Sequence, residues 1–218
     1  MLLFPDITKL SPDDLLLYPT KAFEGPIYLI ETIADADEAC EYLRNFSHIG
    51  FDTETKPNFK KGRKNRVALL QLSTTEKAFL IRTNKIGIPR SVASILADPN
   101  IMKIGAATKD DIGTLKSLSN FEPKAIFDLQ PLVRSFGVEQ LGLKNIAALF
   151  LGIRISKGQQ LTNWENETLT PQQQLYAATD AWVCLEIYKA IDKAGYFQNP
   201  PKIVVPTTVE SDQTAETI

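Results

Sequence analysis

Two acidic residues, Asp52 and Glu54, stand one residue apart at the end of a short apolar stretch, Ile49–Thr55. Side chains alternate across a β-strand, so both carboxylates should project from one face of the strand, together with Gly50. Like carboxylates a few ångströms apart resist joint ionisation, and burial deprives them of water. The pair therefore needs a positive partner, which is either a neighbouring Arg or Lys or a hard metal ion.

A third candidate acid lies near the start of a helix predicted from about Thr108. Asp111 precedes Leu115 by four residues and so shares its inward face, whereas Asp110 is rotated away from it. We therefore favour Asp111 as the site residue. The helix dipole alone also explains an acid in the first turn, so this choice depends on the spacing.

The longest predicted helix supplies the fourth acid. It begins with Thr170 as N-cap and Pro171 in its first position, and it runs to about Ala194. One inward stripe along this helix contains Tyr176 and Asp180, four residues apart. The tyrosine alone fits an ordinary core aromatic, but an ionised acid on a core stripe is rarely left unpaired.

These acids must be positioned by a chain of 218 residues, 44% of them hydrophobic, which is enough for one globular domain with a large core. A net charge of −2 excludes the strongly basic proteins that coat nucleic acid. The two cysteines are far apart in apolar stretches and predict buried free thiols. Without a signal peptide or a membrane-spanning apolar run, we expect a soluble, cytoplasmic protein that does not contact a membrane.

The chain divides into three parts by composition. Residues 1–26 contain four prolines and predict an irregular N-terminal arm, and residues 198–218 predict a disordered tail. Between them, residues 27–197 alternate strand-like and helix-like segments, which indicates an α/β fold. Two of the strand-like segments, Val67–Ser73 and Ala78–Ile81, are separated by a short turn and predict an antiparallel hairpin.

The candidate ligands are all oxygen donors. Carboxylates suit Mg²⁺ or Mn²⁺ better than zinc, and the chain has a single histidine to offer a transition metal. The four acids that we expect to face inward are Asp52, Glu54, Asp111 and Asp180. Together they favour a divalent metal ion as the positive partner.

Three motifs in order give the chain a family resemblance. Phe51–Thr55 resembles the Asp-x-Glu motif of the DEDD superfamily of 3′–5′ exonucleases, and Lys103–Leu115 resembles the second motif. Tyr176–Asp180 is similar to the Tyr-x-x-x-Asp motif of the tyrosine (DEDDy) subgroup. With Leu143–Ala147 and Lys157–Trp164 between them, the motifs have a spacing that resembles ribonuclease D and the exonuclease domain of the Werner syndrome protein.

The resemblance implies a ribonuclease H-like fold, in which a mixed central β-sheet is flanked by helices. It also implies hydrolysis of phosphodiester bonds from the 3′ end of DNA or RNA by a two-metal mechanism. Two Mg²⁺ or Mn²⁺ ions would be held by Asp52, Glu54, Asp111 and Asp180. Tyr176 would then orient the attacking water, because a phenol with a pKa near 10 is a poor base at neutral pH.

The expected partner is a nucleic acid with a single-stranded or frayed 3′ end. The residues that we expect to contact it are Lys56, Arg66, Lys157, Gln160 and Trp164. Lys56 and Arg66 bound a loop with six cations and no acid, which suits contacts to phosphates but also suits a solvated surface. The sequence indicates neither DNA nor RNA in preference, and it identifies no protein partner.

An alternative function is a catalytically degenerate module of the same fold that only binds nucleic acid. A second alternative is a nuclease of this fold that cuts internally. The presence of the expected residue at all five catalytic positions favours an exonuclease over the degenerate module.

Overall fold

The computed structural model of the chain describes residues 9–57, 66–156 and 158–200. Its helices and strands are α1 (Pro12–Leu16), β1 (Ile27–Ile30), α2 (Ile33–Leu43), β2 (His48–Thr55), β3 (Val67–Ser73), β4 (Ala78–Ile81), α3 (Thr83–Ile86), α4 (Arg90–Ala97), β5 (Met102–Gly105), α5 (Thr108–Lys116), β6 (Ile126–Asp128), α6 (Leu129–Ser135), α7 (Leu143–Leu151) and α8 (Pro171–Lys193). Within these ranges, no helix combines the length and the apolar composition needed to cross a membrane. The predicted disordered tail falls almost wholly on residues 201–218, outside the described residues.

A six-stranded sheet in the order β1-β4-β3-β2-β5-β6 forms the centre of the molecule. The predicted hairpin of β3 and β4 is antiparallel, and β2 also pairs with β3 in antiparallel fashion. The other three pairs, β1 with β4, β2 with β5 and β5 with β6, are parallel. The α/β fold with a mixed sheet that the sequence predicted is therefore confirmed.

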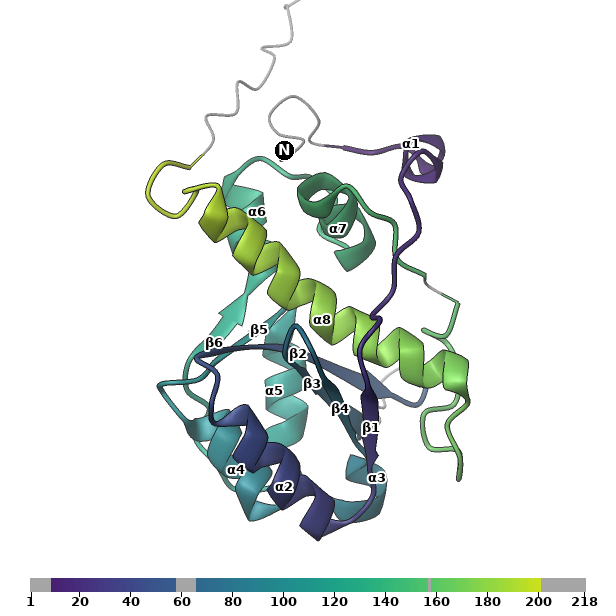
Figure 1. Ribbon diagram of the computed structural model, residues 1–218, viewed down its shortest axis with the longest axis vertical. Helices are drawn as coiled ribbons and strands as arrows, with labels where there is room; N and C mark the ends of the chain where they lie inside the picture. Colours follow the sequence, from purple (N-terminus) through teal and green to yellow (C-terminus); the bar gives the residue numbers. More distant parts are fainter. Residues whose placement is uncertain (1–8, 58–65, 157, 201–218) are drawn as a thin grey trace, which may run out of the picture.

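Helices cover both faces of this sheet (Figure 1). Ile49 and Phe51 of β2 face the apolar core beneath α2 and α4, and both are fully buried. The alternate residues of the strand, including Gly50, face α8 on the other side. The predicted alternation of β2 thus places Asp52 and Glu54 on the α8 face of the sheet.

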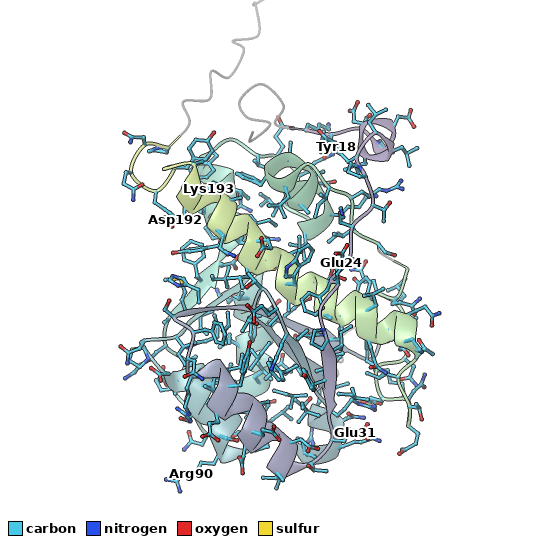
Figure 2. All side chains as sticks on the ribbon, viewed as in Figure 1. Tyr18, Glu24, Glu31, Arg90, Asp192 and Lys193 are labelled. Carbon is cyan, nitrogen blue, oxygen red and sulfur yellow. The ribbon has the colours of Figure 1, made fainter. Side chains whose placement is uncertain are left out.

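Helix α8 runs across the sheet and begins with a side-chain cap. At its start, the Thr170 hydroxyl accepts a hydrogen bond from Gln173 N, and the Gln173 side chain accepts one from Thr170 N, which completes a capping box. Asp192 and Lys193 mark the far end of the helix (Figure 2). The predicted start at Thr170–Pro171 is confirmed.

The inward face of α8 is wider than the single stripe that the sequence predicted. The five consecutive residues Ala177–Ala181 are all buried. The arm that precedes β1 crosses the outer side of this helix, and Glu24 of the arm lies beside its middle (Figures 1 and 2). Because the arm and α7 cover what would otherwise be a solvent-facing side, periodicity alone understated the burial.

Candidate active site

Three carboxylates gather where the end of β2 meets α8. Oxygen atoms of Asp52, Glu54 and Asp180 lie within 4.8 Å of one another. Asp180 is buried, while Asp52 and Glu54 are partly exposed. The sequence predicted this meeting of strand and helix from two separate motifs, and the structure brings these three residues together.

Gly50 explains how closely the two elements approach. A Cβ atom at this position would overlap the carbonyl oxygen of Ala181, so the backbone of α8 rests directly on the backbone of β2. Only glycine permits such an approach. Since Asp180 precedes Ala181 and Asp52 follows Gly50 by two residues, this contact sets the separation of the two acids.

Asp111 is placed differently from the other three acids. In the described residues, it does not belong to the group of acids whose oxygens lie within 4.8 Å of one another. Its Oδ1 instead accepts a hydrogen bond of 2.6 Å from the hydroxyl of Thr53, which lies between the two acids of β2. Asp111 is half-buried, whereas Asp110 is exposed, as the predicted choice between them requires.

Asp128, at the end of β6, fixes the start of α5. Its carboxylate accepts hydrogen bonds from the backbone N–H groups of Ala107 and Thr108, each 3.0 Å long. Ala107 has φ 62°, a left-handed conformation that is unusual for a residue with a side chain. A third hydrogen bond, from Gln130 N, makes the same carboxylate the cap of α6. Asp128 thereby ties the helix that carries Asp111 to the edge of the sheet.

The acids of the site raise one another's pKa values. Burial and the charges of Asp180 and Asp111 raise the pKa of Asp52 well above its usual range. Burial, followed by the charges of the neighbouring acids, raises the pKa of Glu54 to about 10. Burial also raises the pKa of Asp111. Such shifts are expected of carboxylates crowded together without a cation.

The donor set fits a hard divalent ion. Convergent carboxylate oxygens are the ligands that Mg²⁺ and Mn²⁺ prefer, and a cation would favour the charged form of each acid. The three gathered carboxylates could bind a metal directly, with Asp111 beside them.

Tyr176 lies one turn before Asp180 on α8 and hydrogen bonds to its carboxylate. Burial and the charges of Asp180 and Glu54 raise the pKa of its phenol, so the hydroxyl keeps its proton and acts as a donor. The ring of Trp164 packs at 6.0 Å from the ring of Tyr176. Trp164 is fully buried, so the prediction that it contacts substrate is corrected. Its ring packs against the ring of Tyr176 instead.

The loop that contains Trp164 has a long-range contact that the sequence did not reveal. The fully buried guanidinium of Arg82, at the end of β4, donates to the backbone carbonyls of Asn166 and Glu167. It also forms an ion pair of 3.1 Å with Glu31. The loop that contains Trp164 is thereby fastened to the sheet.

A cavity of about 240 Å³ opens beside the acids. Gln160, one of the residues predicted to contact substrate, lines it. Lys56 is exposed and forms an ion pair of 3.2 Å with Glu165, and Arg66 is exposed at the start of β3. Lys157 and residues 58–65 of the basic loop lie outside the described residues.

Sequence reasoning missed several residues that shape this cavity. Lys144, on the first turn of α7, is the one cation among the described residues that line it. Gln130 and Ser156 also line it. No local pattern singles out Lys144 as a cavity residue, and the roles of Asp128 and Gly50 likewise depend on tertiary contacts.

The chain is similar in sequence to known 3′–5′ exonucleases over the region that contains the site. The family model for 3′–5′ exonucleases matches residues 27–195. An exonuclease mut-7 homolog of Aedes aegypti is 30% identical over 209 residues, covering 84% of this chain and 29% of that protein. Ribonuclease D of Haemophilus influenzae is 30% identical over 162 residues, covering 72% of this chain and 39% of that protein. The chain thus spans well under half the length of these relatives.

Solved structures of exonucleases also match the fold of this chain. The Nibbler EXO domain of Aedes aegypti matches with a TM-score of 0.73 and 25% identity, over 84% of this chain and 95% of that domain. Ribonuclease D of Escherichia coli matches with a TM-score of 0.67 and 25% identity, over 78% of this chain and 46% of that protein.

Proposed function

The chain belongs to the DEDD group of 3′–5′ exonucleases, and from this premise we propose that it removes nucleotides from the 3′ end of a nucleic acid by hydrolysis. The observation that carries the proposal is the convergence of Asp52, Glu54 and Asp180 at one cavity. The tyrosine one turn before Asp180 supports membership of the DEDDy subgroup.

Two Mg²⁺ or Mn²⁺ ions are part of the proposal, with Asp52, Glu54, Asp111 and Asp180 as the residues that would hold them. When bound, such ions neutralise charge that develops on the phosphate and acidify a water molecule for attack. The donor set and the crowding of the carboxylates support this assignment.

Other residues of the cavity would orient the substrate. The protonated hydroxyl of Tyr176 is suited to position a water molecule or a phosphate oxygen as a hydrogen-bond donor. Lys144 and Gln160 also line the cavity and offer a cation and an amide to phosphate oxygens. Beside several carboxylates, a positive side chain is needed to bring an anionic strand close to the site.

We propose a single-stranded or frayed 3′ end as the substrate, because a cavity of about 240 Å³ is far smaller than an intact duplex. Lys56, Arg66 and Lys157 remain proposed contacts to the strand outside the cavity. The exonuclease domain is proposed to extend over residues 27–197. A cytoplasmic location is proposed as well, supported by the free, buried thiols of Cys40 and Cys184.

Shortening of a 5′-labelled single strand, in DNA and RNA versions, tests the proposal. Ladders of products that shorten from the 3′ end are expected with Mg²⁺ or Mn²⁺ and not with EDTA. Asp52→Ala should lower the rate by about a thousandfold or more, since a metal ligand contributes several kcal/mol to catalysis. Asp37→Ala, an exposed acid on α2, is the matched control.

Tyr176→Phe separates orientation from binding. Loss of the hydroxyl should lower kcat more than it weakens substrate binding, because the ring and its packing on Trp164 are retained. Binding of the strand without cleavage by the wild-type protein would instead favour the degenerate binding module. An unchanged rate on a strand with a blocked 3′ end would favour internal cutting.

A further inference from the structure

The N-terminal arm lies outside the region matched by the family model, yet it is fastened to the catalytic domain. Lys21 N donates to the carbonyl of Arg154, and Arg154 N donates to the carbonyl of Pro19, each over 2.9 Å. Phe23 N donates to the hydroxyl of Thr179 on α8, over 3.1 Å. Phe23 is also buried. These contacts hold the arm in a fixed position beside α8.

A second cavity, of about 280 Å³, lies between the arm and α8. One side is a helical stripe on α8 at three- and four-residue steps. The other sides are the arm at residues 20–22 and the loop that contains Gln159. The lining residues used below are Ala22, Ser156, Gln159, Gln172, Leu175 and Tyr176.

This cavity adjoins the one that contains the acids. Tyr176 and Ser156 line both of them. A strand whose reacting phosphate lies at the acids therefore has a neighbouring group within reach of the second cavity. Because the two cavities share these two lining residues, a strand bound at the acids is the occupant that we favour for the second cavity, in preference to an unrelated ligand.

The chemistry of the walls indicates which part of the substrate enters. Leu175 remains 39% exposed although it is apolar, and with Ala22 and the Tyr176 ring it offers surface to a flat, apolar face. Gln159 and Gln172 offer amide donors and acceptors. No carboxylate is among the described residues that line this cavity. A nucleobase has matching features, with two π-faces and a hydrogen-bonding edge.

We propose that this second cavity binds the base of a nucleotide next to the scissile bond, so that the N-terminal arm forms part of the substrate site. This proposal rests on the proposed function, because it takes the substrate to be a nucleic-acid strand. It adds a base-binding site whose wall is supplied by residues that precede the family's domain.

Equilibrium binding tests the proposal without turnover. Ca²⁺ replaces Mg²⁺, and the ligands are fluorescent single strands that are intact or carry one abasic site at the first, second or third position from the 3′ end. For wild-type protein, loss of the base at either the first or the second position, the two that adjoin the scissile bond, should raise Kd by about tenfold, as expected for one stacked base. Loss of the base at the third position should raise Kd by less.

Ala22→Trp should fill the cavity and bring the ratio of abasic to intact Kd close to one. Leu175→Ser should lower the same ratio by a smaller factor, about threefold, and its exposed position on α8 makes folding insensitive to the change. Ala34→Trp on α2 and Leu16→Ser on α1 are exposed controls that should keep the wild-type ratio. If Ala22→Trp fails to fold, the ratio of abasic to intact Kd measured for Leu175→Ser tests the proposal by itself.

Equal Kd values for all four strands in the wild-type protein would overturn the proposal. A wild-type ratio in both Ala22→Trp and Leu175→Ser would overturn it as well. Failure of the proposed function is a separate result: no shortening of the intact strand in Mg²⁺ or Mn²⁺, whatever the binding ratio.

Discussion

The acids of the site are held in two different ways. Asp52, Glu54 and Asp180 are placed by β2 and α8, whose backbones touch at Gly50 and Ala181. Asp111 comes from the short helix α5 and is held by hydrogen bonds, from Thr53 to its own carboxylate and from the start of the helix to Asp128. The first arrangement depends on steric contact, and the second on polar tethers.

This difference indicates a division within the site. Backbone contact leaves little freedom, so the fold itself gathers three of the acids. A carboxylate that accepts one hydrogen bond from a hydroxyl can exchange that partner at small net cost. We therefore expect Asp111 to adjust when an ion binds, while the other three acids keep their places.

Gly50→Ala should break the steric arrangement. The added methyl group overlaps a backbone carbonyl, so β2 and α8 must separate, and we expect a loss of about 3 kcal/mol or more in the free energy of unfolding. Hydrolysis should fall at least a hundredfold although no acid has changed. Thermal unfolding and strand-shortening rates measure both effects. Gly113→Ala on α5, which meets no atom within 4 Å, is the matched control, and equal effects of the two substitutions would refute the idea.

Asp128→Ala should release the polar tether of α5. Loss of an acceptor for several backbone N–H groups should cost about 2 kcal/mol, which corresponds to a Tm about 4–8 °C lower. The rate should fall by more than the fraction unfolded explains, because Asp111 loses its fixed helix. Asp128→Asn keeps one acceptor oxygen and should recover part of both losses. A normal rate in folded Asp128→Ala would show that the tether does not position Asp111.

Thr53→Val tests the second tether with a smaller change. The substitution keeps the shape of the side chain and removes the 2.6 Å hydrogen bond to Asp111. We expect kcat to fall about tenfold and KM to change little, because the strand still binds. Thr114→Val removes a comparable hydroxyl, which bonds to the Asp110 carbonyl, and serves as the control. A fall confined to KM would contradict the assigned role.

Glu54→Gln should change the pH dependence of stability in metal-free protein. The pKa of Glu54 is raised in the folded state to about 10 from its ordinary value of 4.5, so its favourable contribution is complete below pH 4.5 and is lost as pH rises towards 10. The Tm of Glu54→Gln relative to wild type should therefore increase between pH 5 and 8, to about 3 °C or more at pH 8. Melting curves in EDTA measure this difference, and a difference that shrinks with pH would contradict it.

The elements that carry the motifs were predictable from the sequence. Alternation in Ile49–Thr55 placed Asp52 and Glu54 on one face, and cap signals placed the start of α8. These features depend on residues close together in the chain, where periodicity and capping are reliable guides. The convergence of both elements at one site was expected from the inward-facing acids and their need for a cation, and the resemblance of the motifs to a known family supported it.

What could not be predicted depends on contacts between distant segments. Trp164 was expected at the surface, but Arg82, more than 80 residues earlier, fastens its loop to the sheet. The parallel pairing of β1 with β4 and the arm's passage over α8 are likewise absent from any local pattern. Lys144 was passed over because one lysine on a helix carries no signal until the fold places it beside the acids.

The anchor formed by Arg82 has a consequence for the order of folding. Its guanidinium is positioned to donate to the loop carbonyls by the pairing of β4 with β1 and by the ion pair with Glu31. The contact between Arg82 and the loop at Asn166 joins residues more than 80 positions apart in the chain. We expect it to form late in folding, because distant contacts form after local ones. Trp164 can support Tyr176 only once that loop has docked. Refolding protein should therefore recover its sheet before it recovers the ability to cleave a strand.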